Sequence, residues 1–404
     1  NDYLPSRLRV LSSESAGKLE PDFVSNPWEA DLDLTAEEER EVERLKDENK
    51  LDELFRMLFI RQCNKLHEIL PELFEETHDY TELLLTISFT DKDGVVYHLT
   101  HDIPEEDFDV RKQGQVEIIG WLYQYYNTEP KDEVFALLKK NVKITKERIP
   151  AATQLFTPDW IVRYMVENSL GRIFVNQRLA SENDSMTESE RVEKEKAIAE
   201  QMGWKYYLPE AEQTPEVRAA LSDRWLVAGG RNAMCDALSS DHGSLATDHC
   251  TLTTVKFIDP CMGSGHILVY AFDVLMQIYE AQGYTQRDAA RSIVENNLYG
   301  LDIDKRAYQL AYFAVMMKAR QYNRRILSQG IAPNLYAIND SDAMTGDVLD
   351  YIANGDKAMR NDLGSIANDL RNAREYGSII DVAPVNFDAL FARFEEIEGE
   401  VHLY

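Results

Sequence analysis

The feature that most constrains this chain is a glycine turn between a short apolar strand and a helix, at residues 259–266. The turn reads Asp-Pro-Cys-Met-Gly-Ser-Gly-His and follows the apolar run from Val255 to Ile258. After it, apolar residues recur at helical spacing up to Ile278. Glycines in such a turn let the backbone approach a ligand, and the helix start offers unpaired N–H groups to an anion. The pattern predicts a nucleoside-binding turn.

A second strand that ends in acid lies downstream. Residues Leu298 to Asp302 are mostly apolar and end in a carboxylate, where a doubly wound fold places the group that binds a ribose diol. One carboxylate can accept a hydrogen bond from each of two hydroxyls, so Asp302 is the candidate. A Gly-x-Gly turn alone also occurs in connections that bind nothing. The order of the two features is what indicates an α/β domain with a nucleoside site.

The sequence of the turn differs from that of a nicotinamide-binding turn. A nicotinamide-binding turn normally reads Gly-x-Gly-x-x-Gly, whereas here a proline directly follows Asp259. Upstream, a Phe-Thr-Pro segment at 156–158 precedes a predicted helix. The two motifs, in this order, resemble the cofactor motifs of amino-group DNA methyltransferases.

The resemblance extends along nearly the whole chain. The segments 1–7, 101–108, 116–124 and 149–158 are similar to the adenine-specific methyltransferases of bacterial BREX phage-defence systems, the PglX family. The resemblance implies a Rossmann-like domain of the γ class that methylates adenine N6 in double-stranded DNA with S-adenosylmethionine. It also implies host self-marking, with DNA and other BREX defence proteins as partners.

The resemblance gives each pocket residue a role. Thr157 would hydrogen-bond the carboxylate of the cofactor's methionine, Asp259 its ammonium group and Asp302 the ribose. The glycine turn would pass close to the ligand. The residues expected to bind cofactor are Phe156, Thr157, Asp259, Met262, Gly263, Ser264, Gly265, Asp302, Ile303, Asp340 and Asp342. Helix capping is an alternative explanation for Thr157 and for Ser264.

The adenine end of the cofactor is less sharply assigned. Ile303 would cover one face of the adenine ring. A third apolar strand, Leu335 to Ile338, precedes two acids, and the family places there an acid that accepts from the adenine amino group. Spacing slightly favours Asp342 over Asp340 and leaves both open.

One motif of the family has no counterpart in the chain. Adenine N6 is a poor nucleophile, so these enzymes flip the base and hold it at an Asn-Pro-Pro-Tyr or Asp-Pro-Pro-Tyr tetrapeptide. Neither tetrapeptide occurs in the 404 residues. We therefore assign no catalytic residue. We expect an N-terminal fragment of a longer methyltransferase that binds S-adenosylmethionine weakly and does not methylate DNA alone.

Two other functions fit the same motifs. A modification enzyme of a type I or combined restriction–modification system shares the glycine turn and the Phe-Thr-Pro segment. A non-catalytic subunit of a defence complex would keep the fold as a docking platform. Absence of cofactor binding would favour the non-catalytic subunit.

The chain is expected to form two domains. Residues 1–145 are predicted to be mainly helical, with a helix start at Thr35 and a small β-hairpin whose turn is Asp93-Gly94. Residues 146–404 are predicted to form a partial methyltransferase domain. A polar insertion at about 176–254 interrupts that domain.

Charge and composition bear on partners and compartment. The formal net charge of −28 repels duplex DNA unless basic residues gather locally. Basic residues do gather between 139 and 148, although a solvated helix end explains them equally well.

The chain has no signal segment and no membrane-length apolar run, and its four cysteines are scattered. These features predict a cytoplasmic protein without disulfides, bound metal or membrane contact. Cys235, His242, His249 and Cys250 match no zinc spacing.

Overall fold

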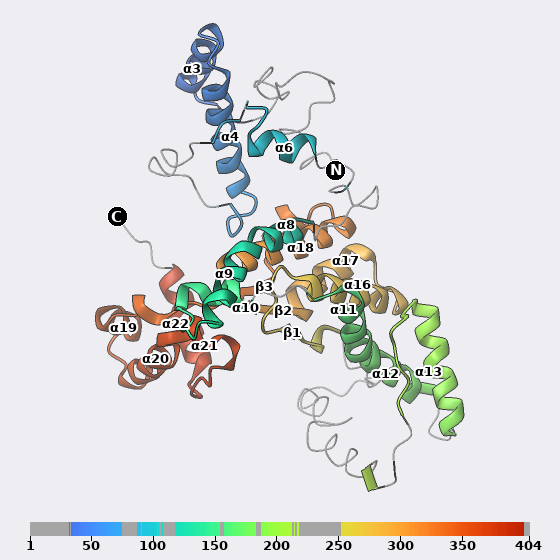
Figure 1. The fold of residues 1–404 in the computed structure, drawn as a ribbon. Helices are drawn as coiled ribbons and strands as arrows, with labels where there is room; N and C mark the ends of the chain where they lie inside the picture. The colour runs from blue at the N-terminus through green and yellow to red at the C-terminus, as the bar shows by residue number, and fades with distance from the viewer. Residues whose placement is uncertain are drawn as a thin grey trace. The chain divides into compact units, whose positions relative to one another are not determined.

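The chain folds into two compact units. A computed structural model describes residues 34–74, 87–89, 91–102, 118–153, 157–182, 187–211 and 252–399, with single positions 32, 104, 107, 214, 216 and 217. One unit comprises residues 1–122 with 312–331, and the other residues 123–311 with 332–404. The described residues are mostly helical, with one small parallel sheet (Figure 1).

The first unit has its core around two helices. The helix α3 (Ala36–Asp47) begins at Thr35, as predicted, and its first turn is a capping box between Thr35 and Glu38. The next helix is α4 (Leu51–His67), in which Phe55 stacks on Phe89 with ring centroids 4.6 Å apart. The core consists of Leu32, Val42, Leu45, Leu54, Phe55, Leu58 and Phe89.

The predicted β-hairpin is wrong in its second arm. Residues after the expected turn form α6 (Val95–His101). Gly94 has φ −82°, whereas the favoured two-residue hairpin turn of an Asp-Gly pair needs a positive φ at the glycine. Val96 packs against the core of the first unit, so tertiary packing overrides the β propensity of this run. In the first arm, residues 83–86 lie outside the described residues, and 87–89 form no strand.

Three short parallel strands organise the second unit. They are β1 (Phe257–Asp259), β2 (Leu298–Asp302) and β3 (Asn334–Ala337), in the spatial order β1-β2-β3. Their register pairs Asp259 with Gly300 and Asp302 with Ala337. The three predicted strands are confirmed. Because all three run in parallel, the residues that follow them gather at one edge of the sheet.

One face of the sheet is covered by the helix that follows the glycine turn, α16 (His266–Ala281) (Figure 1). Gly300 permits this packing. A Cβ on Gly300 would lie 2.9 Å from Leu268 Cδ1 and 2.8 Å from Leu335 Cδ2, and would also collide with Met262. Side chains alternate along a strand, so Ile258 and Tyr336 belong to the opposite face, and each is 57% exposed.

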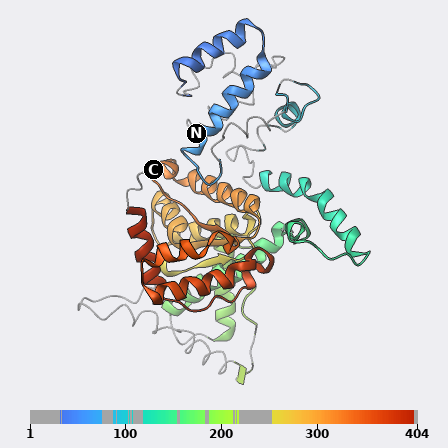
Figure 2. The same ribbon diagram turned by 90° about the vertical axis from the view of Figure 1, so that its left-hand side faces the viewer.

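The other helices flank the sheet in sequence. Before β1 the chain forms α8 (Ile118–Tyr126), α9 (Thr128–Leu138), η3 (Lys146–Arg148), α10 (Ile149–Thr153), α11 (Asp159–Val166), α12 (Arg172–Glu182) and α13 (Glu188–Met202). Between the strands lie α17 (Gln286–Ser292) and α18 (Lys305–Tyr322). After β3 come η8 (Ser341–Ala343), α19 (Gly346–Ala353), α20 (Lys357–Asp369), α21 (Ala373–Tyr376), η10 (Gly377–Ile379) and α22 (Phe387–Gly399) (Figure 2). A small core of Leu349, Ala353, Leu363 and Leu390 joins α19, α20 and α22.

A π turn links α11 and α12 into one continuous helix. The turn spans Glu167–Gly171 and buries Glu167. One carboxylate oxygen of Glu167 accepts the Tyr270 hydroxyl of α16 at 2.8 Å, and the other accepts the Tyr206 N–H at 2.6 Å. The π turn therefore ties α16 to the segment that follows α13.

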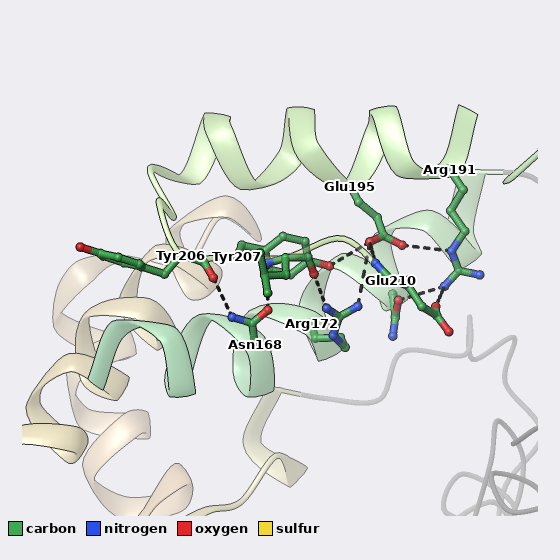
Figure 3. Close-up of polar contacts among 9 residues, drawn as sticks. Asn168, Arg172, Arg191, Glu195, Tyr206, Tyr207 and Glu210 are labelled. Carbon is green, nitrogen blue, oxygen red and sulfur yellow. Dashed lines mark hydrogen bonds and ion pairs between the residues drawn. The ribbon is translucent and has the colours of Figure 1, made fainter. Parts of the chain in front are cut away.

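A polar cluster holds α12, α13 and the segment 204–210 together (Figure 3). Glu195 is fully buried and accepts hydrogen bonds from Arg191 Nε at 3.1 Å, the Tyr207 hydroxyl at 3.3 Å and the Glu210 N–H at 3.0 Å. The Arg172 guanidinium lies over the Tyr207 ring. The predicted insertion at about 176–254 therefore begins as ordered helix, and residues 218–251 lie outside the described residues.

Glu195→Gln is expected to lower the free energy of unfolding by about 1–3 kcal/mol, because an amide replaces one accepting oxygen with a donor. Glu193→Gln, at an exposed position of the same helix, should change it by less than about 0.5 kcal/mol. Urea unfolding followed by circular dichroism measures both. Equal effects would show that the cluster does not hold α13.

Candidate functional site

The ends of β1 and β2 bring the glycine turn and Asp302 together. The Gly263 N–H donates to Asp302 Oδ2 at 2.8 Å, and the Asp304 N–H donates to Oδ1 at 2.8 Å. Beside this contact, the Met262 N–H donates to the Leu301 carbonyl at 3.0 Å. The two motifs singled out from the sequence thus meet directly. Both oxygens of Asp302 are oriented by the main chain.

The two glycines of the turn differ in their surroundings. Gly263 has φ +55°, and a Cβ there would meet nothing within 4 Å, so it faces open space. Gly265 has φ +85° and is the N-cap of α16. A Cβ on Gly265 would lie 3.0 Å from Ala311 Cα, so this glycine lets α18 approach closely. Gly263 is the one placed to border a ligand.

Asp259 and Ser264, at the turn, each bury a polar atom that has no hydrogen-bond partner among the described residues. Asp259 is 6% exposed, and its Oδ1 accepts the Cys261 N–H at 3.1 Å while its Oδ2 accepts nothing. The Ser264 hydroxyl is likewise buried and unpaired. The capping explanation of Ser264 is wrong, because α16 has no side-chain cap. Buried polar groups are normally satisfied, so these atoms favour a polar ligand at this position.

Burial raises the pKa of both strand-end acids. It raises the pKa of Asp259, and the negative charge of Asp302 adds to the effect while the Cys261 N–H opposes it. Burial also raises the pKa of Asp302, against the opposing hydrogen bonds from Asp304 and Gly263. A cation or a hydrogen-bond donor bound here would relieve this cost.

The expected wall residue Thr157 lies just before α11. The N-cap of that helix is Pro158, and it has no side-chain cap, so the capping explanation of Thr157 is also wrong. Phe156 lies outside the described residues. α11 packs against α16, with the Arg163 guanidinium 4.7 Å from the centre of the Tyr270 ring. The helix after Thr157 therefore contacts the helix that follows the glycine turn.

The two candidates after β3 differ in their surroundings. Asp340 forms an ion pair with Lys146 at 2.5 Å and accepts the Arg374 N–H at 3.0 Å. The neighbouring ammonium of Lys146 lowers the pKa of Asp340. Asp342 is exposed. At the end of β2, Ile303 is half-buried, and a Cβ on Gly377 would lie 3.3 Å from its Cγ2.

One residue that supports the site was missed from the sequence. The Tyr123 hydroxyl donates to Asp304 Oδ2 at 2.6 Å, and Asp304 Oδ1 accepts the Arg306 N–H at 3.0 Å. Burial, with the bond to Asp304, raises the pKa of Tyr123 to about 12. Since the Asp304 N–H also holds Asp302, Tyr123 acts on the site through one intermediate residue. Its separation of 181 residues from Asp304 leaves no local signal in the sequence.

Comparison with known proteins adds an independent observation. Residues 236–347 match the family described as MmeI, DNA-methyltransferase domain. The adenine-specific methyltransferase PglX of Lacticaseibacillus casei (strain Zhang) is 41% identical over 395 residues, which are 96% of this chain. The adenine-specific methyltransferase BrxX of Escherichia coli O9:H4 (strain HS) is 39% identical over 339 residues, 84% of this chain.

The chain is a homologue of the PglX and BrxX adenine-specific methyltransferases. The resemblance inferred from the motifs is thereby confirmed. The homologous region spans 29% of the length of PglX and 24% of that of BrxX. The MmeI match contains the glycine turn, Asp302 and β3, whereas Thr157 and Tyr123 lie before it.

Within the described ranges, no three His, Cys, Asp or Glu side chains gather as they would around a metal ion. The cluster of cysteine and histidine between 235 and 250 lies outside those ranges. No described helix has both the length and the apolar character for crossing a bilayer.

Asp259→Asn is expected to raise the free energy of unfolding at neutral pH. The folded chain holds the Asp259 proton more tightly than the unfolded chain, so the stability of the unmodified protein falls as pH rises from about 4 through the raised pKa. The advantage of the variant should therefore vanish in acid. Chemical unfolding across pH measures it, with the exposed Asp381→Asn as control. An advantage that is constant with pH would contradict the buried charge.

Proposed function

We propose that this chain forms the cofactor-binding part of a DNA methyltransferase that transfers a methyl group from S-adenosylmethionine to adenine N6 in double-stranded DNA. The observation that carries the proposal is the contact between the Gly263 N–H and Asp302, because it joins two nucleoside-binding motifs in one site. Homology to adenine-specific methyltransferases supplies the reaction class. In this proposal the three strands belong to a Rossmann-like sheet, and the protein marks host DNA together with other BREX defence proteins.

The residues at the strand ends fit this cofactor. Each oxygen of Asp302 uses one lone pair on a main-chain N–H and keeps another for a ribose hydroxyl. Asp259 Oδ2 would accept from the methionine ammonium, whose charge offsets the cost of burying the carboxylate. The open space beside Gly263 leaves room for the ligand. When bound, S-adenosylmethionine supplies an electrophilic methyl group on its sulfonium.

Burial distinguishes the two acids proposed to bind the adenine amino group of the cofactor. The Asp340 side chain is 12% exposed and oriented by Lys146 and the Arg374 N–H, whereas Asp342 is exposed to water. A hydrogen bond to the adenine amino group gains more in a shielded place. We therefore favour Asp340 as the acceptor, which reverses the slight preference from spacing. Ile303 and Thr157 keep their proposed roles at the adenine face and the methionine carboxylate.

A second function is a docking subunit of a defence complex without catalysis. A modification enzyme of a restriction–modification system would use the same site. Cofactor binding separates the docking subunit from both enzymes.

Asp302→Ala is expected to weaken binding of S-adenosylmethionine to the 404-residue chain by at least about 100-fold, because two hydrogen bonds to a charged group are lost at about 1.5–3 kcal/mol each. Titration calorimetry measures the change, and Asp381→Ala should bind as the unmodified chain does. Since Asp302 also orients the turn, Asp302→Asn serves as the conservative variant and is expected to lie between them. Equal affinity of all variants would contradict the site.

The 404-residue chain is expected to transfer no methyl group to duplex DNA, because it has no tetrapeptide to hold a flipped adenine. Incorporation of radiolabelled methyl from S-adenosylmethionine into DNA measures this. A full-length relative with the tetrapeptide is the positive control. Robust methylation by the chain alone would overturn the expectation.

A further inference from the structure

We infer that the segment 139–148 contacts the phosphate backbone of duplex DNA beside the site. This inference rests on the proposed function, since it names the surface that would meet the substrate. The segment stands out by charge. Between Glu133 and Asp159 the chain carries Glu147 as its one acid, and the basic residues of this stretch are Lys139, Lys140, Lys143, Lys146 and Arg148. The whole chain, by contrast, has a formal charge of −28.

Four of the five cationic groups of this segment are available for a partner. Lys139, Lys140, Lys143 and Arg148 are exposed, and their side chains form no ion pair or hydrogen bond with the described residues. Elsewhere many cations are already paired with carboxylates. Examples are Arg44 with Glu48, Arg163 with Asp159, Arg191 with Glu195, Arg291 with Glu295 and Arg360 with Asp350.

Helix capping explains only part of this cluster. α9 ends at Leu138, and Asn141 beyond it has φ +58°; the Asn141 and Val142 N–H groups donate to the Leu138 and Leu137 carbonyls. Lys139 and Lys140 lie at that end, where positive charge favours the helix dipole. Lys143 and Arg148 lie beyond the helix and gain nothing from the dipole. The helix dipole therefore accounts for Lys139 and Lys140 only.

The segment lies next to the candidate site. Lys146 binds Asp340, which follows β3, and Arg148 is nine positions before Thr157 along the chain. In Figure 2 α9, drawn in teal, runs outward from the sheet, and the chain turns back beyond its end to α10. An acidic protein repels a duplex over most of its surface, so approach is favoured where a local basic stripe borders the site.

Charge reversal tests this contact. In the 404-residue chain, Lys139→Glu, Lys140→Glu and Lys143→Glu are combined, and anisotropy of a fluorescently labelled duplex is measured between about 50 and 200 mM salt. We expect at least about tenfold weaker binding and a salt slope shallower by about 2–3. The matched control combines Lys196→Glu, Lys205→Glu and Lys357→Glu, which changes the net charge equally at exposed positions without partners. It should bind at least several-fold more tightly than the first variant.

The outcomes separate this inference from the proposed function. Equal weakening in both triple variants, or no duplex binding by the unmodified chain, would overturn the contact. Displacement of the duplex by poly-glutamate at equal charge would assign the segment to an acidic protein instead. Calorimetry with S-adenosylmethionine is run on the same samples. If the unmodified chain binds S-adenosylmethionine but the lysine substitutions leave its duplex affinity unchanged, only this inference is contradicted. If the unmodified chain does not bind S-adenosylmethionine, the proposed function is contradicted.

Discussion

The carboxylate of Asp302 is the constraint on which the rest of the site depends. It accepts one N–H from the glycine turn after β1 and one from the start of α18, so a single side chain fixes the spacing of three elements. Tyr123 extends the network through Asp304 to α8. A binding group held in this way loses little conformational freedom when a ligand arrives, and this favours affinity.

Glu195 and Asp259 are both buried carboxylates of the second unit, and they differ in how fully hydrogen bonds compensate their burial. Glu195 is enclosed by three donors, so its charge contributes to holding α13 in place. Asp259 has one donor, and one oxygen is left without a partner among the described residues. The first arrangement is what a structural carboxylate requires, and the second is what a binding site leaves for its ligand.

The sequence predicts the parts of this structure that depend on local patterns. The three strands, the capping box at Thr35 and the meeting of Asp302 with the turn all follow from short runs of residues. It fails where tertiary contacts decide. The Asp93-Gly94 hairpin gives way to helix because Val96 packs into a core, and Tyr123 reaches Asp304 across 181 positions. Helix caps at Thr157 and Ser264 were plausible by composition, but neither forms.

The π turn at Glu167–Gly171 sets the rotational phase between two halves of one helix. Successive residues of an α-helix advance by roughly 100°, so the extra residue of a π turn rotates everything after it. α11 can then face α16 while α12 faces α13. Deleting one residue of this turn would rotate α12, and with it the cluster around Glu195, about the helix axis relative to α11. The length of this turn therefore controls the direction in which α12 and the cluster around Glu195 point relative to α16.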